Sequence, residues 1–73
     1  KEGSYTTALL SNEDKMLKKV VEEAAEVALA CKSADKRAQH WEVADLIYHL
    51  MVAMEGKDID LEGVYRMLAE RRK

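Results

Sequence analysis

Two pairs of acidic residues have a spacing that could support chemistry on a helix. Glu23 and Glu26 are three positions apart, and so are Glu42 and Asp45. Residues three or four positions apart are neighbours on a helix surface, so each pair predicts two carboxylates on one face. Carboxylate oxygens are the ligands that hard divalent cations prefer. The pattern therefore indicates a Mg²⁺ site, with Mn²⁺ as the alternative ion.

The surroundings of the second pair support this interpretation. Glu42, Asp45 and His49 share one narrow helix face, and the opposite face carries Val43, Ile47, Leu50, Met51 and Met54. A helix that is apolar almost all round is expected to be covered on both sides, where carboxylates are costly unless they are paired or bind a metal. Glu23 and Glu26 alone fit a solvated face better. With the second pair, the metal site and the solvated face are equally good interpretations.

Other metals fit the sequence less well. Cys31 is the single cysteine, and no Cys/His set has zinc-finger spacing. Di-iron helical bundles use a Glu-x-x-His pair, whereas His49 follows Asp45 by four positions and position 46 is a leucine. Zinc and di-iron chemistry are therefore disfavoured.

Lysines accompany the first acidic pair. Lys19 lies one turn before Glu23 on the same predicted face, which makes it the first candidate for a phosphate contact. Lys15 is the second candidate. An ordinary Lys–Glu helix pair is the alternative for Lys19, and a structural role is the preferred interpretation for Lys15.

Three helices are expected to position these residues. Their predicted bounds are 12 to 31 or 32, 36 to 55, and 61 to about 71. Ser11 with Asp14 resembles a capping box, Gly56 is expected to end the second helix in a left-handed conformation, and Asp60 is expected to cap the third. The short connection between the first two helices predicts antiparallel neighbours.

The remaining segments have less regular patterns. Residues 3–7 are predicted to form a loop, followed by one helical turn over residues 7–10. Trp41 lies away from both the apolar and the acidic face of its helix, which suits subunit packing or a base pocket, with packing preferred. The core stripe predicted for the first helix consists of Leu17, Val20, Val21, Ala24, Ala28 and Cys31.

Length and composition favour a small all-α domain that associates with itself. The chain has 73 residues, no proline and only three glycines. A chain this short is marginally stable alone, so a homodimer is expected to complete its helical bundle. A net charge of −2 with dispersed charges disfavours nucleic acid as a partner. The absence of a long apolar run argues against a membrane location, and the unpaired cysteine favours the cytoplasm.

The order of the acidic residues resembles a known signature. Glu22-Glu23-x-x-Glu26 followed by Glu42-x-x-Asp45 is similar to the all-α nucleoside triphosphate pyrophosphohydrolases, the superfamily of MazG-type enzymes and dimeric dUTPases. Within that superfamily, the strings GSYT, KVVEE, ADLIYHL and DLEGV resemble the phosphoribosyl-ATP pyrophosphohydrolase family of histidine biosynthesis; they stand at residues 3–6, 19–23, 44–50 and 60–64. The resemblance covers nearly the whole chain.

This resemblance implies a reaction and roles for residues. The reaction is hydrolysis of the α–β phosphate linkage of 1-(5-phosphoribosyl)-ATP, which gives phosphoribosyl-AMP and pyrophosphate. The implied Mg²⁺ ligands are Glu23, Glu26, Glu42 and Asp45. Glu22 would support these ligands or act as the base for a metal-activated water. The other residues that match the motifs, and that the resemblance places near substrate, are Ser4, Tyr5, Thr6 and His49, for which capping, packing or structural roles are the alternatives.

The resemblance also bears on domain organisation. Proteins similar to this chain usually carry a preceding helix or a fused phosphoribosyl-AMP cyclohydrolase domain. We therefore expect residues 1–73 to form a single domain that lacks such an amino-terminal part. Two alternatives remain for its function. One is a related pyrophosphohydrolase acting on a canonical or damaged nucleotide, and the other is a non-catalytic helical dimerisation module.

Overall fold

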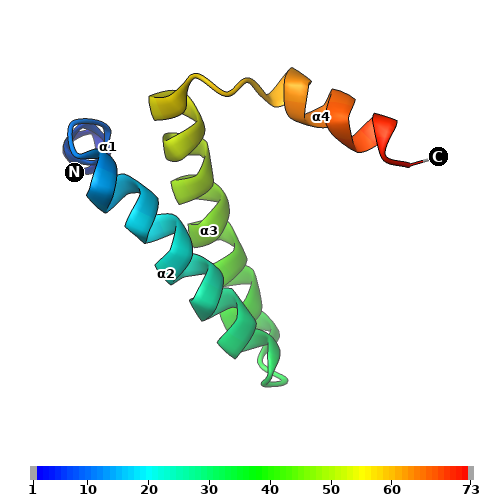
Figure 1. The fold of residues 1–73 in the computed structure, drawn as a ribbon. Coiled ribbons are helices and arrows are strands. Elements are labelled where there is room, and N and C mark those ends of the chain that lie inside the picture. The colour runs from blue at the N-terminus through cyan, green and yellow to red at the C-terminus, as the bar shows by residue number, and fades with distance from the viewer. Residues whose placement is uncertain (1, 73) are drawn as a thin grey trace.

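The computed structural model describes residues 2–72 as helices joined by short connections (Figure 1). In chain order these are α1 (Glu2–Leu10), α2 (Glu13–Cys31), α3 (Lys36–Lys57) and α4 (Leu61–Glu70). No strand occurs within residues 2–72, which confirms the predicted all-α class. None of the helices described there is long and apolar enough to cross a membrane. The predicted domain limits, Lys1 and Lys73, lie outside the described residues.

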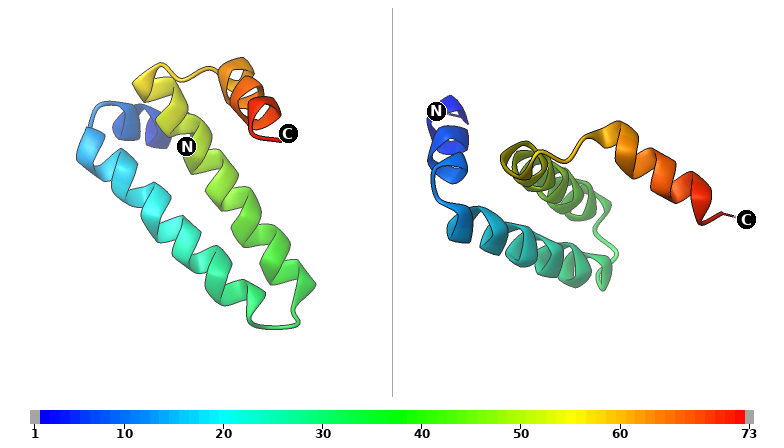
Figure 2. Two further views of the ribbon diagram at one scale, coloured as in Figure 1. Left: turned by 45° about the vertical axis from the view of Figure 1, so that its right-hand side comes forward. Right: turned by 45° about the horizontal axis from the view of Figure 1, so that its top comes forward.

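Helices α2 and α3 form the antiparallel pair that the short connection predicts (Figures 1 and 2). Each begins with a side-chain cap. Asn12 accepts a hydrogen bond from the backbone N–H of Lys15 at 3.2 Å, and Asp35 accepts one from Ala38 at 3.1 Å. The prediction that Ser11 caps α2 is wrong, because its hydroxyl donates to the Ala8 carbonyl instead.

The end of α3 differs from the prediction. The helix continues through Gly56 to Lys57, and Asp58 takes the left-handed conformation with φ 62°. Aspartate adopts this conformation more readily than most residues because its short polar side chain bonds locally. Gly56 serves close packing: a Cβ built there would lie 2.7 Å from the Met16 sulfur, and Met16 is only 2% exposed. The glycine therefore lets α2 and α3 approach one another.

Replacing this glycine is expected to destabilise the fold. In Gly56→Val the added side chain overlaps Met16, so the free energy of unfolding should fall by about 1–3 kcal/mol. Gly3→Val is the matched control, because a Cβ at Gly3 meets nothing within 4 Å. Urea denaturation followed by circular dichroism, at one protein concentration, measures both. Equal midpoints for the two variants would contradict this account of Gly56.

The predicted loop over residues 3–7 is wrong, because this segment lies within α1. Local propensity is poor here, and a helix of nine residues is marginal in isolation. Contacts with α3 supply the missing stability: the Tyr5 hydroxyl bonds to His49, and the Thr6 hydroxyl bonds to that of Tyr48. Leu9 is fully buried. Tertiary contacts therefore decide the conformation of α1.

The buried core lies where α1 meets α2 and the carboxyl-terminal half of α3. It consists of Leu9, Met16, Val52 and Ala53, with Tyr5, Val20 and Tyr48 packed against it. The core stripe predicted for the helix that the structure shows as α2 is wrong apart from half-buried Val20, since its other members are exposed. On α3, the apolar face is likewise exposed at Val43, Ile47, Leu50 and Met51. Glu23 and His49 are buried between the helices, whereas these apolar stripes are uncovered.

Helix α4 stands apart from the rest of the chain (Figure 1). Asp60 caps it as predicted, accepting a hydrogen bond from Gly63 N–H at 3.1 Å, and its bounds agree with the prediction to within one residue at the carboxyl end. Contacts between the described helices join α1, α2 and α3 but not α4. Its apolar residues recur at helical spacing and are largely exposed: Leu61, Val64, Tyr65 and Leu68.

Candidate active site

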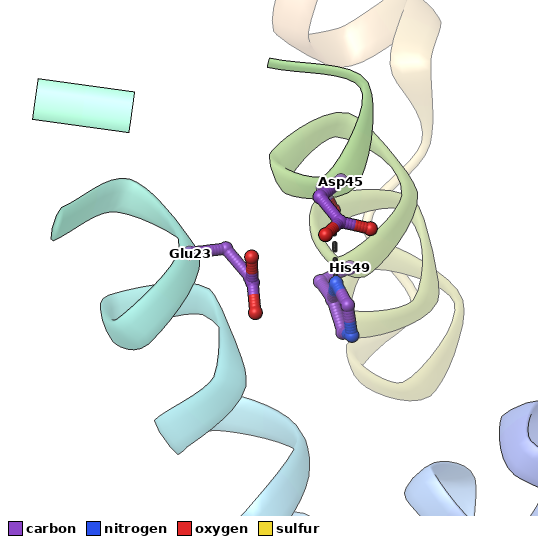
Figure 3. A group of neighbouring side chains, drawn as sticks. All are labelled: Glu23, Asp45 and His49. Carbon is purple, nitrogen blue, oxygen red and sulfur yellow. Dashed lines mark hydrogen bonds between the residues drawn. The ribbon is translucent and has the colours of Figure 1, made fainter. Parts of the chain in front are cut away.

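A carboxylate from α2 meets a carboxylate and an imidazole from α3 (Figure 3). One oxygen or nitrogen atom from each of Glu23, Asp45 and His49 lies within 4.8 Å of the others. Glu23 is 8% exposed and His49 is 5% exposed, whereas Asp45 is half-buried. The structure thus brings together one member of each acidic pair, between the two long helices. Sequence analysis did not identify His49 as part of this group of donor atoms.

The other two acidic residues act on the same region electrostatically. Partial burial raises the pKa of the Glu42 carboxyl group, and the negative charges of Glu26, Asp45 and Glu23 raise it further. Glu42 is half-buried and Glu26 is exposed. The carboxylates of the two helices are therefore close enough to repel one another, and a divalent cation bound between them would reduce this repulsion.

Lys19 is the cation nearest to these carboxylates. Its ammonium group lies 3.3 Å from Glu23 and 3.4 Å from Glu22. The hydrogen bond to Glu23 raises the pKa of Lys19, and Glu22 adds to this effect against the opposing influence of burial. Lys19 therefore stays charged at neutral pH and partly neutralises Glu23.

Glu22 belongs to a lysine-rich groove beside the carboxylates. It pairs with Lys18 at 3.9 Å as well as with Lys19. The groove has a volume of about 650 Å³ and is lined by Asn12, Asp14, Lys15, Lys18, Lys19 and Glu22. Both predicted phosphate contacts, Lys15 and Lys19, lie here. Sequence analysis missed Lys18, although its position one turn before Glu22 is visible in the sequence.

Hydrogen bonds fix the tautomer of His49. Its Nδ1 lies 2.8 Å from the backbone carbonyl of Asp45, which can only accept, so Nδ1 carries the proton and donates. Nε2 therefore accepts a hydrogen bond from the Tyr5 hydroxyl at 2.8 Å. Because Nε2 is engaged in this way, the carboxylates are the better candidates for metal ligands. Of the other predicted substrate contacts, Thr6 bonds to Tyr48 and Ser4 is exposed on α1.

Removing the Glu42 charge is expected to stabilise the metal-free protein. Glu42→Gln removes a charge that burial and the neighbouring carboxylates both disfavour, so Tm at neutral pH without divalent cations should rise by a few degrees. A raised pKa in the folded state means that the folded chain binds more protons than the unfolded chain. The free energy of unfolding of the original protein should therefore fall as pH rises from 4.5 through the raised pKa, and this fall should be smaller in the variant.

The same pair of proteins tests metal binding. Saturating Mg²⁺ should raise Tm more in the original protein than in Glu42→Gln, because the variant has lost a carboxylate. Glu55→Gln removes the same charge from an exposed position of α3 and is the control. Thermal melts across pH, with and without Mg²⁺, measure these effects. If the metal-free Tm of Glu42→Gln were lower than that of the original protein, the proposed repulsion between Glu42 and its neighbouring carboxylates would be contradicted.

The fold and the site together define a class of protein. An all-α chain in which acidic residues from two antiparallel helices converge beside a lysine-lined groove has the arrangement expected of the all-α nucleotide pyrophosphohydrolases. The sequence pattern of phosphoribosyl-ATP pyrophosphohydrolase matches residues 1–72. The chain belongs to the phosphoribosyl-ATP pyrophosphohydrolase family.

Curated relatives agree with this assignment. The chain is 51% identical over 73 residues to a phosphoribosyl-ATP pyrophosphatase of Streptococcus sanguinis, covering 99% of this chain and 70% of that protein. A phosphoribosyl-ATP pyrophosphatase of Clostridium botulinum is 47% identical, with 99% of this chain and 66% of that protein covered. The histidine biosynthesis bifunctional protein HisIE of Nostoc is 51% identical, and the match covers 99% of this chain but only 34% of that protein. No solved structure matches the chain.

Proposed function

We propose that this chain hydrolyses 1-(5-phosphoribosyl)-ATP to phosphoribosyl-AMP and pyrophosphate in histidine biosynthesis. The observation that carries the proposal is the meeting of Glu23 and Asp45 across α2 and α3, with Glu42 under repulsion from both. These acidic residues are the ones whose order resembles the superfamily signature. The names of the relatives support the substrate.

The donor set fits Mg²⁺, with Mn²⁺ as the alternative. Carboxylate oxygens of Glu23 and Asp45 come from two helices and lie close together, and burial together with the neighbouring negative charges raises the pKa of Glu42. The proposed ligands are Glu23, Glu26, Glu42 and Asp45. When bound, the ion supplies charge neutralisation for the phosphates and lowers the pKa of a coordinated water.

The chain's own residues would bind and orient the substrate. The triphosphate end lies in the lysine-rich groove, where Lys19, Lys15 and Lys18 contact the oxygens of the departing pyrophosphate. Glu22, which pairs with Lys18 and Lys19, would accept the proton of the attacking water. His49 acts as a positioning residue, because its bond to the Asp45 backbone carbonyl fixes its ring and its bond to Tyr5 holds α1 against α3 beside the carboxylates.

Pyrophosphate release tests this proposal. The protein is incubated with Mg²⁺ and phosphoribosyl-ATP, and in parallel with dUTP, dCTP and ATP. Release from phosphoribosyl-ATP alone, or far faster than from the other nucleotides, is the expected result. Preferred release from dUTP or dCTP would instead support the related nucleotide pyrophosphohydrolase, and no release from any of them would favour the non-catalytic helical module.

A second copy of the chain is the proposed partner. Helix α4 has ten residues and contacts no other helix within the described part of the chain. An isolated helix of this length is unstable in water, so another surface must hold it. The exposed apolar stripe of α3, formed by Val43, Ile47, Leu50 and Met51, is such a surface. In the proposed homodimer, α4 of each copy packs against the apolar stripe of α3 in the other copy.

The bifunctional relatives suggest a neighbouring activity. The chain spans about a third of the length of those relatives, so the rest of each relative can hold a second domain. A phosphoribosyl-AMP cyclohydrolase, fused or separate, is the activity that would consume the product. The cytoplasm is the proposed location, since Cys31 has no second cysteine to pair with.

A further inference from the structure

An aromatic pocket lies next to the carboxylates, between α1 and α3. It has a volume of about 430 Å³ and is lined by Tyr5, Trp41, Ala44, Asp45, Tyr48 and His49. This volume suits a small-molecule ring system. Trp41 is 63% exposed and stands one helical turn before Asp45, so a large aromatic surface is open to solvent beside the site. The proposed function has assigned no substrate group to this surface.

The walls of this pocket are held in place by hydrogen bonds and stacking. The Tyr5 hydroxyl bonds to His49, and the Tyr48 hydroxyl bonds to Thr6. The rings of Tyr5 and Tyr48 lie 18° from parallel with centroids 6.2 Å apart, and the ring of His49 stands edge-on to both. A pocket whose walls are fixed before binding loses less entropy when a ligand enters.

The electrostatics of the pocket favour a flat cation. Among the lining residues that the described chain supplies, Asp45 alone is charged, and it is acidic. Glu23 and Glu42 add negative charge nearby. The faces of aromatic rings carry negative potential and attract cations, most strongly at tryptophan. A neutral ring would gain stacking here but not the attraction between charges.

We propose that this pocket binds the adenine ring of the substrate and selects a ring made cationic by substitution at N1. The inference rests on the proposed function, whose substrate carries ribose at that nitrogen. An adenine alkylated at N1 is a much stronger base than adenine itself and holds a delocalised positive charge at neutral pH, whereas the adenine of ATP is neutral. Trp41 precedes Asp45 by about 6 Å along α3, a span comparable to the ribose between base and α-phosphate. The pocket therefore discriminates against ATP by charge.

Direct binding measurements separate charge from shape. 1-Methyl-AMP is cationic, 1-methyl-IMP has nearly the same shape but is neutral, and AMP lacks the methyl group. Trp41 is the single tryptophan, so quenching of its fluorescence reports ring stacking in this pocket. With saturating Mg²⁺ present, 1-methyl-AMP should bind about tenfold more tightly than either neutral nucleotide. Equal affinities for 1-methyl-AMP and 1-methyl-IMP would overturn the proposal.

Variants at Trp41 test the aromatic wall. Calorimetry, which needs no tryptophan signal, should show that Trp41→Leu loses most of the preference for 1-methyl-AMP, and that Trp41→Phe keeps a substantial part of it. A preference unchanged in Trp41→Leu would also overturn the proposal. Failure of the proposed function looks different: the cationic nucleotide would still quench Trp41, while phosphoribosyl-ATP would release no pyrophosphate.

Discussion

Asp45→Asn is expected to lower kcat for pyrophosphate release from phosphoribosyl-ATP by about 100-fold or more. The substitution keeps the size of the side chain and leaves the backbone carbonyl that accepts from His49 in place. It removes a negative charge that lies within 4.8 Å of Glu23 and faces Glu42. The variant should therefore fold while binding Mg²⁺ weakly, and steady-state kinetics across Mg²⁺ concentrations measure both effects.

A matched control makes this result specific. Asp58→Asn is the same chemical change at an exposed position, and asparagine tolerates the left-handed conformation found there. It should retain the full rate. Circular dichroism of Asp45→Asn should match that of the original protein. A variant with normal kcat and normal Mg²⁺ dependence would remove Asp45 from the proposed metal site.

The elements that depend on local chemistry could be predicted from the sequence. Side-chain caps and short connections are encoded within a few residues, so the bounds of α2, α3 and α4 agree with the prediction to within about two residues. The meeting of Glu23 and Asp45 could be predicted for the same reason, because helical spacing defines one face on each helix, whereas Glu26 is exposed and lies outside that group of donor atoms. Their convergence across the two helices follows once α2 and α3 are antiparallel, and the structure places Glu23 opposite Asp45 accordingly.

Features that depend on distant contacts could not be predicted in this way. The sequence of α1 has no strong helical signal, and its conformation depends on bonds from Tyr5 and Thr6 to residues more than forty positions away. Gly56 has the chemistry of a helix terminator, yet its role is set by Met16 on another helix. The pocket at Trp41 likewise exists only because α1 packs beside α3.

The misassigned core shows a further limit, which is physical. Apolar periodicity identifies a face that avoids water, but it does not identify which chain covers that face. In α2 and α3 the stripes with the clearest apolar period are exposed, while Glu23 and His49 are buried between the helices. Burial of ionisable groups is costly unless they are partnered, and here Lys19 and Tyr5 are the partners. This inversion supports the proposed site on the acidic face and the proposed subunit interface on the apolar stripes.

Ile47→Glu is expected to dissociate the proposed homodimer. Ile47 is 51% exposed in the single chain and stands at the centre of the apolar stripe of α3. An unpaired charge buried in an apolar interface costs about 3 kcal/mol or more, which weakens association by about 100-fold or more. Light scattering coupled to size-exclusion chromatography should report a change from dimer to monomer at micromolar concentration.

Loss of the dimer should also unfold α4 and lower the activity. Because α4 contacts no other helix in the described chain, it should unfold when the partner leaves, and the helical circular dichroism signal should fall. Pyrophosphate release should fall with it, since the pair α2 and α3 loses the cover on its outer faces. Ala34→Glu adds the same charge in the exposed connection between α2 and α3 and should remain dimeric and active. If Ile47→Glu kept the mass, helicity and rate of the control, the stripe would not be the subunit interface, and α4 would need another binding surface.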